Sequence, residues 1–177
     1  MNLEELFVKR QSTREFSDKE IADETLEKIC RLAVLAPSAI NAQPWNLYAI
    51  NGTKAKEFIK FVQKDGANAW ADGVKAFIVI EQRAPHAIMR GDRRVSNESF
   101  IPNDIGILSA YIALAAEDLG VQSCIIGLRD EKAIAKFLNL PAGTPFPLVI
   151  ALGYKKDDCP VREKRRRQFD LNYKLIK

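Results

Sequence analysis

The chain has 177 residues, of which 47% are apolar and 28% charged, and this ordinary globular composition predicts one domain over residues 1–177. The net charge of +4 is mild and suits a small anionic ligand as well as a nucleic acid. No apolar run is long enough to span a bilayer, and the N-terminus has no signal-peptide pattern. We therefore expect a cytoplasmic protein that does not associate with a membrane.

Few residues of this sequence fit the common catalytic patterns. His86 is the one histidine, which excludes a multi-histidine metal site. The three cysteines are odd in number and lack zinc-ligand spacing, so a reducing compartment fits them best. The sequence contains no serine nucleophile elbow, no dinucleotide-binding glycine motif and no P-loop. This pattern favours chemistry carried by a bound cofactor, with no metal site.

The hydrophobic pattern predicts helices and strands along the first half of the chain. Residues 2–10 have apolar side chains at helical spacing, and residues 23–35 repeat this more strongly, with Asp23 as the expected N-cap. Pro37 ends the second helix because proline lacks the amide hydrogen that a helix needs. The elements expected to follow are a strand over 47–50, a helix over 53–63 and a strand buried on both faces over 76–80.

The second half centres on a long helix predicted over residues 103–119. Its side chains are apolar nearly all round, and a chain of this size has little interior for such a helix. We therefore expect a homodimer in which a second subunit covers one side. Residues 82–101 show no clear period and are expected to form a mobile, exposed connection. The other expected elements are a strand over 123–127, a helix from Asp130 to about Leu138, a strand over 146–153 and an edge strand over 171–175.

A stiff polar loop follows the second predicted helix. Pro37 and Pro44 bracket it, and Ser38, Asn41 and Gln43 between them carry side chains that donate and accept hydrogen bonds. Such a loop suits a polar ligand. It equally suits an ordinary helix-to-strand connection, because loops use the same residues for their turns.

Two basic segments are further candidates for ligand binding. The stretch Arg10-Gln11-Ser12-Thr13-Arg14 is polar and is expected to leave the first helix; if the helix continued this far, both arginines would lie on one face. Paired arginines with a hydroxyl suit a phosphate, although cations at a helix end also stabilise the helix dipole without any ligand. The basic cluster over 162–167 could bind a nucleic acid, but it lacks interleaved aromatic residues. A solvated tail or a phosphate contact therefore fits it better.

Three separated stretches together resemble the FMN-dependent nitroreductase family. The segment Arg10-Gln11-Ser12-Thr13-Arg14 resembles the family's R-x-S-x-R pattern. The loop Pro37-Ser38-Ala39-Ile40-Asn41-Ala42-Gln43-Pro44-Trp45 is similar to its P-S-x-x-N-x-Q-P-W motif, which is the most specific of the three. The third stretch runs from Asp118-Leu119-Gly120 through Ile125-Ile126-Gly127 to Ile150-Ala151-Leu152-Gly153-Tyr154, with basic residues beyond.

The resemblance implies an α+β fold with three layers, in which a central, mainly antiparallel sheet lies between helices. It also implies an intertwined homodimer with exchange of C-terminal strands and one FMN in each of two interface sites. The flavin would carry the chemistry, so no catalytic side chain is implied. The implied cofactor-binding residues are Arg10, Gln11, Ser12 and Arg14, then Pro37, Ser38, Ala39, Asn41 and Gln43, and finally Ile126, Gly127, Lys164 and Arg166.

The resemblance also implies a role for each group of residues. Arg10 and Ser12 would hold the FMN phosphate and ribityl chain, and Arg14 would lie near the pyrimidine edge of the flavin. The loop residues would reach the FMN of the other subunit, and Ile126 and Gly127 would offer backbone amides near flavin N5 and O4. The register of the C-terminal basic contacts is ambiguous between neighbouring residues; Lys164 and Arg166 are favoured.

The function implied by the resemblance is that of an NAD(P)H-dependent oxidoreductase. It would pass electrons through FMN to a small acceptor, such as a nitroaromatic or a quinone, by a ping-pong mechanism. A guanidinium near the pyrimidine edge suits this chemistry, because reduced flavin gains negative charge there. The alternative is a flavin-binding protein with a storage or sensing role and no turnover. Neither reading involves a nucleic acid or a membrane.

Overall fold

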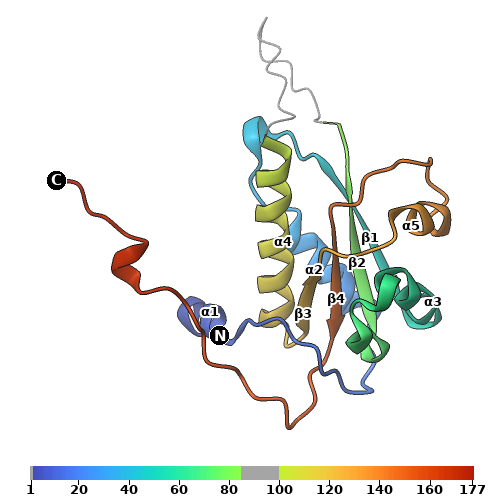
Figure 1. Cartoon of the computed structure of the whole chain (residues 1–177), viewed down its shortest axis with the longest axis horizontal. Helices are drawn as coiled ribbons and strands as arrows, with labels where there is room; N and C mark the ends of the chain where they lie inside the picture. The colour runs from blue at the N-terminus through green and yellow to red at the C-terminus, as the bar shows by residue number, and fades with distance from the viewer. Residues whose placement is uncertain (1, 85–99) are drawn as a thin grey trace, which may run out of the picture.

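The computed structural model describes residues 2–84 and 100–177 and shows a sheet covered by helices on both faces (Figure 1). Four strands form the sheet in the order β1-β2-β4-β3, and every neighbouring pair is antiparallel. The expected α+β fold with three layers is therefore confirmed. The strands are β1 Trp45–Asn51, β2 Ala76–Gln82, β3 Gln122–Ile126 and β4 Leu148–Gly153.

The two faces of the sheet have separate hydrophobic cores. Successive side chains of a strand point to opposite faces, so Ile78 and Ile80 of β2 join one core while Phe77 and Val79 join the other. This explains why the continuous apolar run of β2 is buried on both sides, as predicted. The first core is covered by α2 (Asp23–Ala33) and α4 (Ile101–Asp118), and the second by α3 (Gly52–Val62) and α5 (Glu131–Phe137).

A side-chain cap marks the start of α5 but not that of α2. Asp130 caps α5 as predicted, since its carboxylate accepts a hydrogen bond from the amide of Ala133 at 3.1 Å. The N-cap prediction for α2 is wrong, because Ala22 occupies the cap and Asp23 is the first helical residue. The Asp23 carboxylate instead accepts a hydrogen bond from the side-chain amide of Asn51 at 2.8 Å.

The long helix α4 has one buried face and one exposed face in the isolated chain. Ile105, Leu108 and Ile112 are almost completely buried in the first core. Ile107 and Tyr111 lie on the other side and remain 37% and 39% exposed. The helix is therefore apolar on a face that this chain alone leaves open to solvent.

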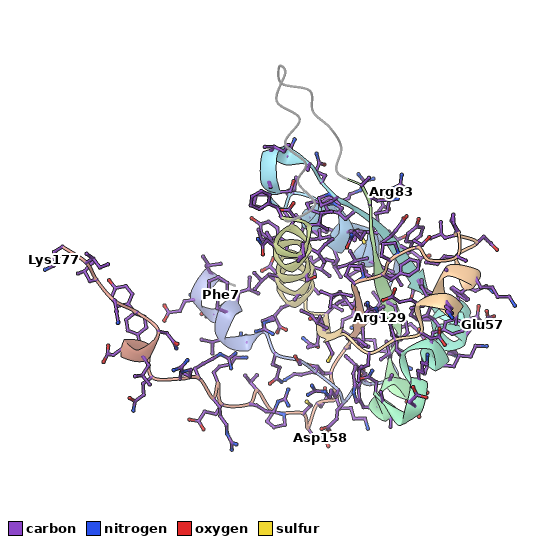
Figure 2. All side chains as sticks on the ribbon, turned by 45° about the horizontal axis from the view of Figure 1, so that its top comes forward. Phe7, Glu57, Arg83, Arg129, Asp158 and Lys177 are labelled. Carbon is purple, nitrogen blue, oxygen red and sulfur yellow. The ribbon has the colours of Figure 1, made fainter. Side chains whose placement is uncertain are left out.

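The C-terminal arm extends away from the body of the molecule, and the N-terminal helix lies at the periphery, where it contacts α4 (Figures 1 and 2). Helix α1 (Leu3–Lys9) contains no buried residue, and Phe7 on it is 55% exposed. The edge strand predicted over 171–175 is wrong for the isolated chain, which has only a short 3-10 helix over Phe169–Leu171 there. A strand requires a neighbour for its backbone hydrogen bonds, and this arm lies apart from the sheet. The apolar residues of the exposed arm are Phe169, Leu171, Tyr173, Leu175 and Ile176.

The predicted connection over 82–101 lies mostly outside the described residues, as does His86. Within the described ranges, no helix is long and apolar enough to cross a membrane. The same ranges contain no group of histidine, cysteine and acidic residues arranged to hold a metal ion.

Candidate cofactor-binding site

A groove of about 610 Å³ lies where the segment after α1, residues 10–14, meets the C-terminal arm, residues 160–177. Its volume is within the usual range for small-molecule sites. The N-terminal segment and the arm are about 150 residues apart in the sequence and contribute all of the lining side chains. Those are Arg10, Gln11, Ser12, Arg14, Arg162, Glu163, Lys164, Arg165 and Arg166.

The N-terminal wall of the groove is an extended segment. Helix α1 ends at Lys9, so the segment over 10–14 leaves the helix, as expected. Ser12 instead forms a parallel bridge with Ser123 at the start of β3, and the Thr13 amide donates to the Ser123 carbonyl at 2.9 Å. Alternate residues of an extended chain share one face. Arg10, Ser12 and Arg14 therefore still lie on one side, by the period of a strand and not that of a helix.

Gln11 fastens the arm to this wall. Its side chain is buried; its amide donates to the Pro160 carbonyl at 2.9 Å, and its oxygen accepts from the Arg162 backbone amide, also at 2.9 Å. The Arg162 guanidinium donates to the Ser12 carbonyl, and the Lys164 ammonium donates to the Arg10 carbonyl. Gln11 was expected to contact the cofactor, but its side-chain hydrogen bonds are to the arm. Arg162 and Arg165 also line the groove and were not predicted.

The groove carries a strong excess of positive charge. Six of its nine lining side chains are cationic and one, Glu163, is acidic. Burial lowers the pKa of Lys164, and the neighbouring charges of Arg10 and Arg166 lower it further. A lowered lysine pKa reflects a cation that is partly desolvated and crowded by like charges. Phosphate groups would neutralise these charges and accept hydrogen bonds from the guanidinium groups and from Ser12, so the side chains present fit a phosphorylated ligand.

Glu117 supplies negative charge beside the groove. It lies in the last turn of α4 and is buried. Burial raises the pKa of Glu117, while Gln122 and the cations of Lys155, Lys164 and Arg10 oppose that rise. The net rise shows that desolvation outweighs these favourable contacts.

The raised pKa predicts a particular dependence of stability on pH. A carboxyl whose pKa is raised in the folded state stabilises the fold only while it is protonated. The free energy of unfolding therefore falls as the pH rises from the ordinary pKa of 4.5 through the raised pKa of the folded state. In Glu117→Gln this loss should be absent. Urea unfolding of both proteins between pH 4.5 and 8 tests this: the stability of the wild type relative to the variant should fall with pH. Glu20→Gln, which removes an exposed carboxylate, is the control; equal slopes for wild type and Glu117→Gln would contradict the prediction.

The loop over 37–45 is held in an unusual backbone conformation. Ile40, Asn41 and Gln43 all have positive φ angles, of 49°, 58° and 44°, which are uncommon for residues other than glycine. The Ser38 hydroxyl accepts a hydrogen bond from the Gln43 amide at 2.9 Å. The Gln43 side-chain amide donates to the Asn41 side-chain oxygen at 3.2 Å. An exposed loop held in such an unfavourable backbone conformation is a candidate for a functional role.

This loop and the groove lie at opposite ends of α4. The buried Asp104, in the first turn of α4, accepts a hydrogen bond from the Ala39 amide at 3.0 Å. Glu117, in the last turn, faces the groove cations Arg10 and Lys164. Thirteen residues of helix separate Asp104 from Glu117, which is about 20 Å at 1.5 Å per residue. The structure therefore does not bring Pro37, Ser38, Ala39, Asn41 and Gln43 together with the groove of the same chain.

The remaining two predicted residues follow the strand that supports the groove. Ile126 is the last residue of β3 and is buried, whereas Gly127 is exposed. The Arg129 guanidinium donates to the Gly127 carbonyl. Neither Ile126 nor Gly127 lines the groove, although Ser123, the second residue of β3, pairs with Ser12.

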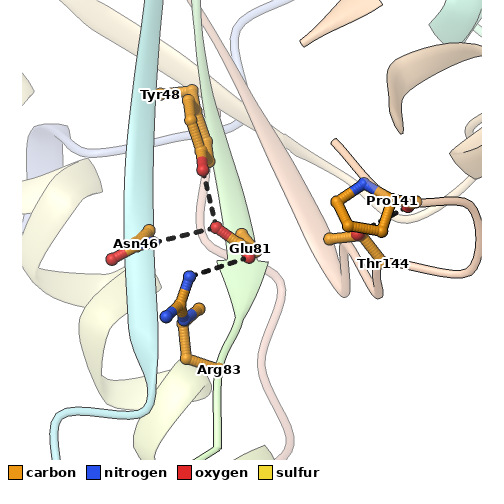
Figure 3. A network of polar contacts seen from close by, with 6 residues as sticks. All are labelled: Asn46, Tyr48, Glu81, Arg83, Pro141 and Thr144. Atoms are coloured by element: carbon orange, nitrogen blue, oxygen red, sulfur yellow. Dashed lines mark hydrogen bonds and ion pairs between the residues drawn. The ribbon is translucent and has the colours of Figure 1, made fainter. Parts of the chain in front are cut away.

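A second polar cluster lies on strands β1 and β2 (Figure 3). The buried carboxylate of Glu81 accepts hydrogen bonds from the Asn46 amide at 2.9 Å and the Tyr48 hydroxyl at 2.7 Å, and it pairs with Arg83 at 3.5 Å. Burial, followed by the hydrogen bond to Glu81, raises the pKa of Tyr48. Both oxygens of the carboxylate have partners, and its hydrogen bonds to Asn46 and Tyr48 tie β2 to β1.

Fold and groove together define a class: three-layer α+β proteins with a cationic groove suited to a phosphorylated ligand. A model of the Nitroreductase family matches residues 7–154, and the chain belongs to this family. An Archaeoglobus fulgidus protein with the provisional name NADH dehydrogenase/NAD(P)H nitroreductase is 32% identical over 159 residues, covering 84% of this chain and 83% of that protein. An iodotyrosine deiodinase from Thermotoga neapolitana is 25% identical, covering 89% of this chain and 91% of the relative.

Solved structures agree with this assignment of the fold. A nitroreductase family protein from Streptococcus pneumoniae superposes with a TM-score of 0.82 at 19% identity, covering 99% of this chain and 100% of that chain. An FMN-dependent nitroreductase from Clostridium difficile superposes with a TM-score of 0.72 at 24% identity, covering 97% and 96% of the two chains.

Proposed function

We propose that this protein is an FMN-dependent oxidoreductase that passes electrons from NAD(P)H to a small organic acceptor. The observation that carries the proposal is the groove, in which six cationic side chains and Ser12 surround a space of ligand size. The family assignment, and the FMN named for the C. difficile structure, support FMN as the phosphorylated ligand. When bound, FMN supplies the two-electron chemistry that none of the side chains of the groove supplies.

In this proposal, the side chains bind and orient the cofactor. Arg10, Ser12, Lys164 and Arg166 hold the phosphate and ribityl chain by charge-assisted hydrogen bonds. Arg14 would lie near the pyrimidine edge, where its positive charge would stabilise the negative charge of the reduced state. Ile126 and Gly127 would offer their backbone amides to the reactive edge of the cofactor.

We further propose that the site is completed by a second copy of the chain. The exposed apolar face of α4, the exposed residues of α1 and the apolar arm together leave a large unpaired surface. The loop over 37–45 lies about 20 Å from the groove of its own chain, by the length of α4 between them. In a homodimer with two-fold symmetry, the loop of each subunit faces the groove of the other, and the arm over 171–175 gains the strand partner that it lacks in isolation.

The proposed activity is tested by anaerobic titration of the FMN-loaded protein. Addition of NADH or NADPH is expected to bleach the flavin absorbance, and addition of a nitroaromatic or a quinone is expected to restore it. Steady-state rates should give parallel double-reciprocal lines, as expected for a ping-pong mechanism. The acceptor panel includes an iodotyrosine, because relatives with that activity align over most of the chain. A protein that binds FMN but is bleached by neither nucleotide would support the storage or sensing alternative.

The composite site predicts complementation between two defective variants. Arg10→Ala damages the groove and Gln43→Ala damages the loop, so a homodimer of either variant has no intact site. In a randomly reassociated mixture, roughly one quarter of all sites should combine an intact groove with an intact loop, because half of the dimers are mixed and each has one such site. Equilibrium dialysis with FMN measures this fraction. A mixture that binds no more FMN than the two variants measured separately would show that groove and loop do not meet across an interface.

A further inference from the structure

Trp70 is an aromatic residue that contacts Arg14 of the groove wall. It belongs to a 3-10 helix over Ala69–Gly73, in a part of the chain without a recognisable motif. The centre of its ring lies 5.9 Å from the guanidinium carbon of Arg14, within the range of a cation–π interaction. On the same segment as Arg14, Phe16 packs against Trp70 with ring centres 6.4 Å apart.

The position of Trp70 is fixed by its own segment. Asn68 adopts a left-handed conformation with φ of 52°, and its side-chain amide donates to the Val62 carbonyl at 2.9 Å. Gln63 donates to the Asp72 carboxylate at 2.8 Å, which ties the end of α3 to the same 3-10 helix. Ala71, next to Trp70, is completely buried. The indole ring is therefore presented to Arg14 by a well-anchored turn.

Arg14 has no carboxylate partner and no hydrogen-bond acceptor for its guanidinium among the residues that the structure describes. An aromatic face attracts the guanidinium through its charge and leaves the five N–H donors free at the edge of the group. A carboxylate in the same place would neutralise the charge and occupy some of those donors. Trp70 can therefore hold Arg14 in place without reducing its capacity to bind a ligand.

We propose that Trp70 is a positioning residue that holds the Arg14 guanidinium toward the pyrimidine edge of FMN and so favours binding of the reduced cofactor. This inference rests on the proposed function. Without the ring, the arginine side chain is free to turn into solvent. The affinity for reduced FMN then falls more than that for oxidised FMN, because reduced FMN carries more negative charge at that edge. Trp70 acts through Arg14 and does not itself touch the reacting atoms.

The test is a double-mutant cycle on the full-length protein with Trp70→Leu, Arg14→Gln and the double variant. FMN dissociation constants are measured for the oxidised cofactor and, under dithionite, for the reduced cofactor. Trp70→Leu should raise the constant for reduced FMN about three- to tenfold and that for oxidised FMN less. Each tenfold difference between the two states lowers the midpoint potential by about 30 mV for a two-electron couple. In the Arg14→Gln background, the same change should have less than about a twofold effect.

Two further variants distinguish loss of the aromatic face at Trp70 from a general effect of substitution. Trp70→Phe retains an aromatic face and should keep most of the wild-type affinity, and it replaces Trp70→Leu as the informative variant if the latter does not fold. Phe137→Leu is the matched control, because it breaks a cation–π contact of similar length, 5.8 Å from Lys54, outside the groove. It should leave FMN affinity unchanged.

The outcomes separate this inference from the function on which it rests. A wild-type protein that binds no FMN would overturn both. If the protein binds FMN but Trp70→Leu lowers FMN affinity equally in the wild-type and Arg14→Gln backgrounds, the inference alone is overturned. The inference is also overturned if Trp70→Leu has the FMN affinity and the midpoint potential of the wild type. In both cases the proposed oxidoreductase activity would stand.

Discussion

Arg10→Ala is expected to weaken FMN binding by about 1.5–3 kcal/mol, the usual contribution of a hydrogen bond to a charged group. This corresponds to about a ten- to hundredfold increase in the dissociation constant, at tenfold per 1.4 kcal/mol. The effect is large because Arg10 lies beside Lys164 in the groove and is half-buried, so water screens its charge only in part. Fluorescence titration of apoprotein with FMN measures it directly.

Two control variants distinguish the proposed contact from a general charge effect. Arg31→Ala removes the same charge from an exposed pair with Glu27 on α2, away from the groove, and should leave FMN affinity unchanged. Arg10→Lys keeps the charge but loses the planar, two-pronged geometry, so its affinity should lie between those of wild type and Arg10→Ala. If Arg10→Ala and Arg31→Ala bind FMN equally well, the phosphate is not held at Arg10.

Gln11→Met is expected to release the C-terminal arm from the groove. The substitution nearly preserves side-chain volume but removes the hydrogen bonds to the Pro160 carbonyl and the Arg162 amide. A buried polar group left without a partner costs about 1–3 kcal/mol. The arm carries Lys164 and Arg166, so FMN affinity should also fall, by about tenfold or more. This loss would follow from release of the arm, because both of these hydrogen bonds of the Gln11 side chain are to the arm.

Limited proteolysis reports on the arm independently of FMN. Trypsin cleaves after lysine and arginine, and residues 162–167 offer several such sites. Cleavage there should be faster in Gln11→Met than in wild type, because the anchored backbone becomes accessible. Gln168→Met makes the same chemical change at an exposed position further along the arm and is the control. Equal cleavage rates for wild type and Gln11→Met would show that Gln11 does not fasten the arm.

Much of the fold is predictable from local sequence pattern. The apolar run of β2 predicted a strand buried on both faces, and Asp130 correctly predicted the start of α5. These signals are local, because side-chain periodicity and capping depend on residues a few positions apart. The wrong prediction for 171–175 has a different origin. Alternation of apolar and polar residues shows that a segment can form a strand, but its hydrogen-bond partner must come from elsewhere.

Only some of the residues of the candidate site are predictable from the sequence. The resemblance singled out Arg10, Ser12 and Arg14, and the structure places them on one wall of a cationic groove. They share this wall because the segment is extended and pairs with Ser123, not because the first helix continues through it. Gln11 was expected at the cofactor, yet its side-chain hydrogen bonds anchor the arm. Nothing near Trp70 in the sequence indicates that it meets Arg14, because the contact crosses from one segment to another.

By itself, the sequence determined the order of helices and strands, the burial of their apolar faces and the motifs that resemble the nitroreductase family. These properties are encoded over short distances along the chain. Only the tertiary structure decided which motifs share a site. Packing of the sheet brings Lys164 to the Arg10 carbonyl across 154 positions of sequence, whereas α4 separates the loop over 37–45 from that groove. The physical reason is that a ligand site depends on distances between segments, which are set when the two cores pack against the sheet.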